Sequence, residues 1–445
     1  MASSNHFDVL VIGSGQAGTP LAEAFAKHGR KTALIERSHI GGCCVNEGCT
    51  PTKTMIASGR VAYLRRRAAD YGVHADAVND GPVTTRIDLL KVRQRKRDIV
   101  DNFRGGSTAR VEAAGVTVLE GDASFQDAHT LKVSLTDGSS KSVSGDLIFI
   151  NTGERPMLPN LEGLSALLDN GNLPRQSHNC PKGSTVAPRE DPDIAKKMQD
   201  ILEEDNISIH LHTDAIKVTI PPSDPITLHT RNSGGTLLDI RGSHLLLATG
   251  RTPNTDTLNL NAAGITPDAR GYIPVSVTLQ TAVPHIYALG DVKGPPSFTH
   301  ISYDDFRIIR TNLLEASSSS PSLSQKTITD RVVPYVIFTD PQLAHVGLHE
   351  SEARAKYPIQ VAKMPMSYVA RALETDESRG VMKAVVHKET GAILGFTCLG
   401  IEGGEVMSVV QMAMLGGVPW MKLKNVVFAH PTLAEGLNNL WGFLE

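Results

Sequence analysis

The chain has 445 residues, 40% of them hydrophobic, and a formal net charge of −3. This length allows two or three domains, each with its own core, and the near balance of charges argues against a protein built to bind nucleic acid. No apolar run is long enough to span a bilayer, and the first six residues carry neither a basic stretch nor an apolar signal core. We therefore expect a cytoplasmic protein with no membrane or nucleic-acid partner.

The first element is an almost continuous apolar strand at 7–13, and the glycines Gly13, Gly15 and Gly18 follow in a GxGxxG pattern that opens a helix to about residue 28. A second strand, at 31–36, ends in Glu36. In this strand–turn–helix context the pattern predicts a dinucleotide site. The glycines let the backbone approach a pyrophosphate, and Glu36 can accept a hydrogen bond from a ribose hydroxyl. An accidental glycine turn is the alternative.

Three of the five cysteines lie in the next segment, 41–53. Cys44 and Cys49 have four residues between them, a spacing that can close a small loop on the first turn of a helix. A thiol at that end of a helix has a lowered pKa and is reactive. Buried cysteines or part of a metal site are the alternatives. A metal site usually needs a second pair or nearby histidines at ligand spacing, and none follows, so we predict no metal site.

The other predicted elements follow in chain order. They are helices at about 53–71 and 87–114, a strand at 116–125, a hairpin at about 129–144 and a strand at 146–150. A polar loop at 170–190, a helix to about 205, a strand at 207–212, a meander at 215–239 and a strand at 244–250 come next. A strand before Gly290, a serine-rich linker at 316–324 and alternating strands and helices at 332–445 complete the chain.

These motifs together resemble the class I pyridine nucleotide-disulfide oxidoreductases, nearest the mercuric-reductase and copper- and chlorine-stress reductase branch. The resemblance rests on the first glycine fingerprint, the segment 41–53, the Asp291 fingerprint and the ending His430-Pro-Thr-x-x-Glu435. It implies an α/β fold of the glutathione-reductase type. An FAD-binding Rossmann-like domain would take residues 1–156 and 244–315, and an α+β dimerisation domain 330–445.

The resemblance also implies roles for the matching residues. Cys49 would lie against the flavin, and Cys44 would attack or release the substrate. His430, oriented by Glu435, would be the acid/base for the pair of the other subunit, which makes a homodimer part of the mechanism. The residues that would bind FAD are Gly13, Gly15, Gly18, Glu36, Gly42, Lys53, Ala123, Thr152, Gly153, Gly290 and Asp291.

The chain departs from the family pattern in several places. No second GxGxxG unit occurs at 157–243, so we predict a reduced NAD(P)-type domain there and leave NAD(P)H use open. An imperfect gene model or degenerate copy is one explanation, and a flavoprotein reduced by another donor is the other. Asn151 and Cys43 replace the usual alanine and threonine. The C-terminal cysteine pair of mercuric reductases is missing, which disfavours Hg(II) reduction.

The predicted function is an FAD-dependent disulfide oxidoreductase that uses Cys44 and Cys49 to reduce a small disulfide or a metal ion. Two alternatives stay open. One is a flavin-dependent dithiol oxidase that does not use NAD(P)H, and the other is a non-catalytic FAD-binding paralogue.

Overall fold

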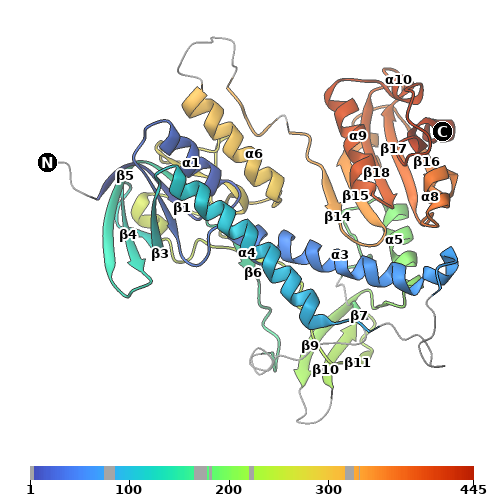
Figure 1. Ribbon diagram of the computed structural model, residues 1–445, viewed down its shortest axis with the longest axis horizontal. Coiled ribbons are helices and arrows are strands. Elements are labelled where there is room, and N and C mark those ends of the chain that lie inside the picture. Colours follow the sequence, from blue (N-terminus) through green and yellow to red (C-terminus); the bar gives the residue numbers. More distant parts are fainter. Residues whose placement is uncertain are drawn as a thin grey trace. The chain divides into compact units, whose positions relative to one another are not determined.

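The structure, a computed structural model, describes residues 5–74, 86–164, 178–179, 183–219, 225–315, 325–329 and 331–445. The chain forms two compact units (Figure 1). Unit 1 contains Met1–Met157 and Gly250–Arg331, and unit 2 contains Leu158–Thr249 and Val332–Glu445. The predicted linker at 316–324 and much of the predicted loop at 170–190 lie outside the described residues. The four-part domain division stays a prediction.

Unit 1 is built on a sheet whose parallel part runs in the order β3-β2-β1-β5-β13. Its strands are β1 (His6–Ile12), β2 (Thr32–Glu36), β3 (Thr117–Phe125), β4 (Thr130–Leu135), β5 (Ser140–Ile150) and β13 (Ile286–Ala288). The ends of β3 and β5 leave the parallel part and pair antiparallel with β4. The second strand of the hairpin predicted at 129–144 and the strand predicted at 146–150 are therefore parts of a single strand, β5.

The alternation of side chains along β1 supplies two cores. Val9 and Val11 pack with helix α1 (Gly18–Lys27) and helix α6 (Thr299–Arg310) on one face of the sheet. Leu10 and Ile12 pack on the other face, with side chains of β4 and of the segment 258–292. Because both faces are covered, β1 can be apolar almost throughout, as a parallel strand is.

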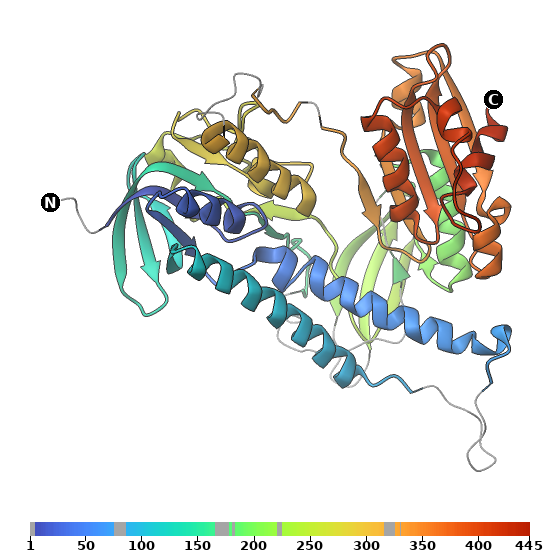
Figure 2. The same ribbon diagram turned by 45° about the horizontal axis from the view of Figure 1, so that its top comes forward.

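The cysteine segment folds into two helices, α2 (Gly42–Asn46) and α3 (Cys49–Arg66). Helix α4 (Leu89–Ala113) packs along α3 (Figure 2). Asp88 caps α4 by accepting a hydrogen bond from the backbone N–H of Lys91 at 3.0 Å. Helix α3 leaves several apolar side chains exposed: Met55, Ile56, Val61 and Leu64.

Unit 2 is organised around an antiparallel sheet in the order β14-β15-β18-β17-β16. The strands are β14 (Tyr335–Ile337), β15 (Gln342–Gly347), β16 (Ile359–Pro365), β17 (Val381–His387) and β18 (Ile393–Gly400). Helix α5 (Pro192–Glu204) packs on one face and α9 (Gly403–Leu415) on the other. The shorter helices are α7 (Glu350–Arg354), α8 (Ala370–Glu374), α10 (Trp420–Lys424) and α11 (Gly436–Leu440).

The rest of unit 2 holds a three-stranded antiparallel sheet, β11-β10-β9. Its strands are β9 (Thr213–Thr219), β10 (Ile226–Asn232) and β11 (Leu237–Gly242). The strand predicted at 207–212 is shorter than expected: it is β8 (Ser208–Ile209), paired in parallel with β7 (His178–Asn179). Within the described part of 158–249, no strand leads into a glycine-rich turn and a helix.

The prediction of a strand at 244–250 is wrong. The structure has no regular element there, and Leu246 is 91% exposed. The strand in this region is β12 (Arg251–Pro253), which pairs with β6 (Glu154–Pro156). An apolar run forms a strand only where a neighbour satisfies its N–H and C=O groups, and 244–250 has no such neighbour among the described strands. No helix in the described ranges is long and apolar enough to cross a membrane.

Candidate active site

The glycine fingerprint forms the sharp turn between β1 and α1. Gly13 has a φ of +96°, and a Cβ at this position would lie 2.4 Å from the carbonyl oxygen of Asn151. A Cβ on Gly18 would lie 2.0 Å from the carbonyl oxygen of Gly13. Both positions therefore require glycine, and the turn exposes backbone N–H groups at the start of α1, where an anionic phosphate is favoured.

A buried amide ties this turn to the neighbouring strands. Asn151 is only 7% exposed, and we assign its amide with the oxygen toward the turn, because in this orientation the oxygen accepts hydrogen bonds from the backbone N–H groups of Gly18 at 2.9 Å and Gly15 at 3.2 Å. Its amide nitrogen donates to the carbonyl oxygen of Leu289 at 3.2 Å. The departure from the usual alanine thus adds three hydrogen bonds beneath the fingerprint.

A cavity of about 390 Å³ runs from this turn to the cysteine segment. The residues predicted to form the site that line it are Gly13, Gly15, Glu36, Gly42, Cys44, Cys49, Ala123, Thr152, Gly153 and Asp291. Gly18 and Gly290 are not in the lining. Gly18 begins α1, and Gly290 donates its N–H to Asp305 at 2.8 Å. Lys53, also outside the lining, lies one turn into α3.

Glu36 and Asp291 are the two predicted site residues whose carboxylates line the cavity. Glu36 accepts hydrogen bonds from the backbone N–H of Ser14 at 3.0 Å and from its hydroxyl at 2.6 Å. Burial, followed by the charge of Glu154, raises the pKa of Asp291. The residues present fit FAD: the glycine turn makes a cradle that a Cβ would fill, and hydroxyl-binding carboxylates line the same cavity as the thiols.

Cys44 and Cys49 are both free thiols, and Cys49 is the first residue of α3. A hydrogen bond from the Cys44 thiol lowers the pKa of Cys49 to about 5. The Thr299 hydroxyl, 3.3 Å from Cys49 Sγ, and the charge of Lys53 act in the same direction. The same bond, together with burial, raises the pKa of Cys44. The reduced pair thus holds its proton on Cys44 and its charge on Cys49.

The third cysteine lies against an ion pair whose carboxylate, that of Glu154, is buried. Cys43 Sγ is 3.7 Å from Nη2 of Arg251, whose Nε lies 3.1 Å from the Glu154 carboxylate. Tyr272 donates its hydroxyl to the same carboxylate at 2.7 Å. Burial raises the pKa of Cys43, although Arg251 opposes this effect. We therefore expect Cys43 to remain a thiol while Cys49 is charged.

Sequence reasoning missed the roles of Thr299, Arg251 and Glu154 beside the cysteines. Arg251 and Glu154 lie in the two segments where the chain crosses between units, and Thr299 is the first residue of α6. Only the fold shows that β6, β12 and the start of α6 converge on the thiols.

The predicted acid/base pair lies in unit 2, just before α11. Nδ1 of His430 lies 2.9 and 3.0 Å from the two carboxylate oxygens of Glu435. The His430 side chain is 66% exposed. A carboxylate on Nδ1 fixes the tautomer and leaves Nε2 directed away from Glu435. The approach of this imidazole to a cysteine pair stays a prediction.

Comparison with known families gives matches over most of the chain. Residues 7–185 and 181–305 match the model "Pyridine nucleotide-disulphide oxidoreductase", and residues 333–440 match that family's dimerisation domain. The first model thus matches in two pieces that meet at 181–185, inside the region where the second glycine fingerprint is lacking.

Individual proteins agree with these matches. The chain is 31% identical to a probable pyridine nucleotide-disulfide oxidoreductase, RclA, of Escherichia coli (strain K12), over 477 residues that cover 99% of this chain and 100% of the relative. It is 32% identical to a mercuric reductase of Shewanella putrefaciens over 96% of this chain and 79% of that one. The solved structure of the HOCl-induced flavoprotein disulfide reductase RclA from Escherichia coli superposes with a TM-score of 0.82, at 30% identity, over 98% of this chain and 99% of the other.

Proposed function

The chain belongs to the pyridine nucleotide-disulphide oxidoreductases, and from this premise we propose that Cys44 and Cys49 are the redox pair of this FAD-dependent reductase of a small disulfide or a metal ion. One observation supports the proposal above the others. Both thiols line the cavity that holds the glycine cradle and Asp291, and the two share one proton.

Because Cys44 holds the shared proton, the first step of the reaction is the removal of that proton. Cys44 attacks a substrate disulfide only after losing its proton, and His430 of a partner subunit is the base that takes it. The attack forms a mixed disulfide and releases one substrate thiolate. Cys49, already a thiolate, then attacks Cys44 Sγ and expels the second thiolate, to which His430 returns a proton. The substrate gains two electrons, and the pair becomes a disulfide.

When bound, FAD supplies the electron pair that returns the disulfide to the dithiol. Lys53 and Thr299 then favour the thiolate form of Cys49. As a substrate, one two-electron metal ion, or two one-electron ions such as Cu(II) reduced to Cu(I), would bind at the two sulfurs and accept the same two electrons, which leaves the pair as a disulfide. One solved relative is a Cu(II) complex of RclA from Escherichia coli, and for this chain we propose redox-active metal ions as one substrate class.

Homodimers follow from the dimerisation domain at 333–440. We also propose that residues 1–156 and 244–315 form the FAD-binding domain, that 157–243 is a reduced NAD(P)-type domain, and that 330–445 is the dimerisation domain. The exposed apolar side chains of α3 supply part of the surface that a second copy covers.

A dithiol oxidase is the second candidate, and one observation favours it. The described part of 158–249 has an antiparallel sheet and lacks a strand–glycine turn–helix unit for a nicotinamide cofactor. For an oxidase, a substrate dithiol would pass its electrons to the disulfide of Cys44 and Cys49, and oxygen would be the final electron acceptor.

Anaerobic titration of the FAD-loaded enzyme separates these functions. NADPH, NADH and dithiothreitol are added separately, and flavin absorbance and titratable thiols are followed. Bleaching by a nicotinamide supports the reductase, and bleaching by dithiothreitol alone supports the oxidase. Both functions predict that reduction of the wild type exposes about two additional titratable thiols per chain. Reduction of Cys44→Ser or Cys49→Ser should expose none. Protein that retains no FAD, or variants with the thiol yield of the wild type, would overturn the proposal.

A further inference from the structure

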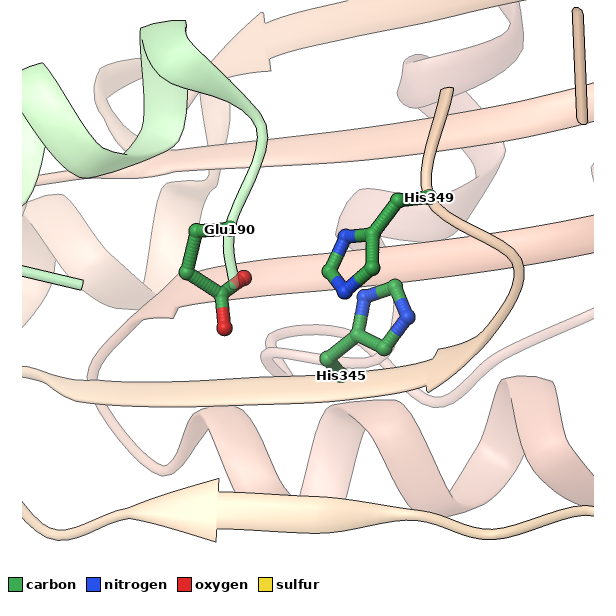
Figure 3. A group of neighbouring side chains, drawn as sticks. All are labelled: Glu190, His345 and His349. Atoms are coloured by element: carbon green, nitrogen blue, oxygen red, sulfur yellow. The ribbon is translucent and has the colours of Figure 1, made fainter. Parts of the chain in front are cut away.

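Unit 2 holds a cluster of metal-ligating side chains that the redox chemistry does not use. Glu190, His345 and His349 each present a ligand atom, and these atoms lie within 4.8 Å of one another (Figure 3). The three come from separate stretches: Glu190 stands just before α5, His345 lies in β15, and His349 directly precedes α7. Figure 3 shows the carboxylate and the two rings gathered in one place.

The pattern of β15 explains the position of His345. Ala344 and Val346 belong to the core under α9, whereas Leu343 packs with α5 on the other face. Because side chains alternate along a strand, His345 shares the face of Leu343. It is 2% exposed there, and Glu190, in the segment that leads into α5, is 9% exposed. A polar cluster is therefore buried between α5 and the sheet.

The hydrogen bonds of His345 leave one ring nitrogen suited to a metal. Nε2 lies 3.1 Å from the carbonyl oxygen of Gly347, which can only accept, so Nε2 carries the proton. Nδ1 then has the lone pair and lies 2.8 Å from the Thr397 hydroxyl, a donor that a metal ion on Nδ1 would displace. Histidines that bind metals commonly donate their other N–H to a backbone carbonyl. The His345 and His349 rings stack with centroids 3.8 Å apart.

Glu190 supplies an independent sign of a ligand. Its Oε1 accepts a hydrogen bond from the Tyr335 hydroxyl at 2.5 Å. Its Oε2 is buried and has no hydrogen-bond partner among the described residues. A buried carboxylate oxygen without a donor is unfavourable unless a cation compensates it.

A neighbouring ion network holds the cluster together. Asp191 and Glu350, the residues after Glu190 and His349, each lie 2.9 Å from Nζ of Lys383. The backbone N–H of Glu350 also donates to Asp191 at 3.2 Å. The two segments that carry Glu190 and His349 are therefore tied to each other one residue away from their ligand atoms.

We propose that Glu190, His345 and His349 bind one divalent transition-metal ion, for which Zn²⁺ is the best match. Two imidazoles and one carboxylate are a zinc ligand set, which leaves a fourth position for water, whereas Ca²⁺ and Mg²⁺ prefer oxygen ligands. Bonds of about 2.0–2.1 Å place tetrahedral ligands roughly 3.4 Å apart, so the side chains close by on the order of 1 Å. The ion would join the segment before α5 to β15, away from the cysteines in sequence and in ligand chemistry.

The test is Zn²⁺ titration of the EDTA-treated, oxidised, FAD-loaded enzyme, in which the redox pair offers no thiolate. Affinity is measured by competition with a chromogenic chelator, and ligand type by X-ray absorption. We expect one equivalent, with nitrogen and oxygen neighbours at about 2.0–2.1 Å. His349→Gln and Glu190→Gln should weaken binding by more than about 100-fold, beyond the usual effect of losing an outer partner.

Matched variants separate ligation from folding. Gln at 190 retains an oxygen that accepts from Tyr335, so metal-free Glu190→Gln should unfold at nearly the wild-type temperature but lose the rise that Zn²⁺ produces. His387→Gln in β17 and Glu405→Gln in α9 remove the same chemical groups from the same unit and should bind as the wild type does. Full-strength binding in both ligand variants, a sulfur shell at about 2.3 Å, or no tight equivalent in the wild type would overturn the proposal.

Discussion

The Cys44–Cys49 pair shares a proton, so the reduced enzyme should carry a thiolate on Cys49 at any pH above about 5. Below this pH the sulfur protonates and the negative charge is lost. We expect the thiolate absorbance near 240 nm, taken as the difference between reduced wild type and Cys49→Ser, to rise with a midpoint near pH 5. An ordinary thiol would titrate near 9.0.

Cys398 is the internal control for this titration. Burial raises its pKa to about 12, so Cys398→Ser should leave the profile unchanged. Cys44→Ala removes the main hydrogen bond to Cys49 and should move the midpoint upward. A wild-type midpoint above pH 8 would show that the charge does not reside on Cys49.

Asn151 is a second residue whose effect can be isolated. Asn151→Ala leaves the N–H groups of Gly15 and Gly18 without their acceptor, and each buried donor without a partner costs about 1–3 kcal/mol. We expect a lower free energy of unfolding in urea by at least about 1 kcal/mol. Asn151→Asp retains the acceptor but places a negative charge under the glycine turn. It should therefore lose less stability than alanine and release FAD more readily, and equal FAD retention in both variants would contradict this role.

The elements of unit 1 could be predicted because their signals are local. The apolar run of β1, the glycines after it and the acidic end of β2 all lie within 36 residues, and the structure has these elements nearly where the pattern places them. Pairing partners are not local. The run at 244–250 has the composition of a strand but no pairing neighbour among the strands that the structure describes, and β5 continues through a predicted break because β4 and β1 pair with its two halves.

The residues of the candidate site also fall into two groups, those that a local motif predicts and those that only the fold brings together. Motifs predicted the glycines, the cysteines and Asp291, which occupy fixed offsets in short segments. The hydroxyl of Thr299 and the Arg251–Glu154 ion pair reach the thiols from more than 100 residues away, and no offset predicts that. The cluster of Glu190 with His345 and His349 escaped notice for the same reason, since Glu190 stands about 155 residues before the two histidines.

The contact between α5 and the five-stranded sheet depends on Lys383. This side chain is 3% exposed and lies within 3.0 Å of Asp191, Asp193 and Glu350. Although burial alone would lower its pKa, the three carboxylates raise it to about 12. Lys383→Met leaves buried carboxylates without their cation, so we expect a loss of about 3–5 kcal/mol in the free energy of unfolding. Lys363→Met, which removes a more exposed lysine from Asp193, should cost less than about 1 kcal/mol.

The pH dependence of this network has a definite sign. Arg354 and Lys383 lower the pKa of Glu350, and the lysines at 363 and 383 outweigh burial to lower that of Asp193. The stabilisation is therefore complete above the ordinary carboxyl pKa and is lost as the pH falls through the lowered values. Urea unfolding between pH 3 and 7 should show this loss in the wild type and much less of it in Lys383→Met. Parallel curves for the two proteins would place the acid sensitivity elsewhere.

At the scale of the whole molecule, the question is whether the active site of one subunit needs a residue of the other subunit in the homodimer. The proposed base, His430, is exposed and oriented by Glu435, whereas the cysteine that needs it holds its proton more tightly than an ordinary thiol. If the base serves the other subunit, a Cys44→Ser chain and a His430→Gln chain are each inactive as homodimers. Their heterodimer has one site with an intact Cys44 and an intact His430.

Co-expression of the two inactive chains tests this arrangement. Random pairing makes about half of the dimers mixed, each with one working site of two, so disulfide-reducing activity should recover to about a quarter of the wild-type value. A base acting within its own subunit allows no recovery, because each chain then lacks one of the two groups. Size-exclusion chromatography of the mixture checks that dimers form, and pairing Cys44→Ser with Cys49→Ser is the matched control. Both defects of that pair lie in one cysteine segment, so it should stay inactive under either arrangement.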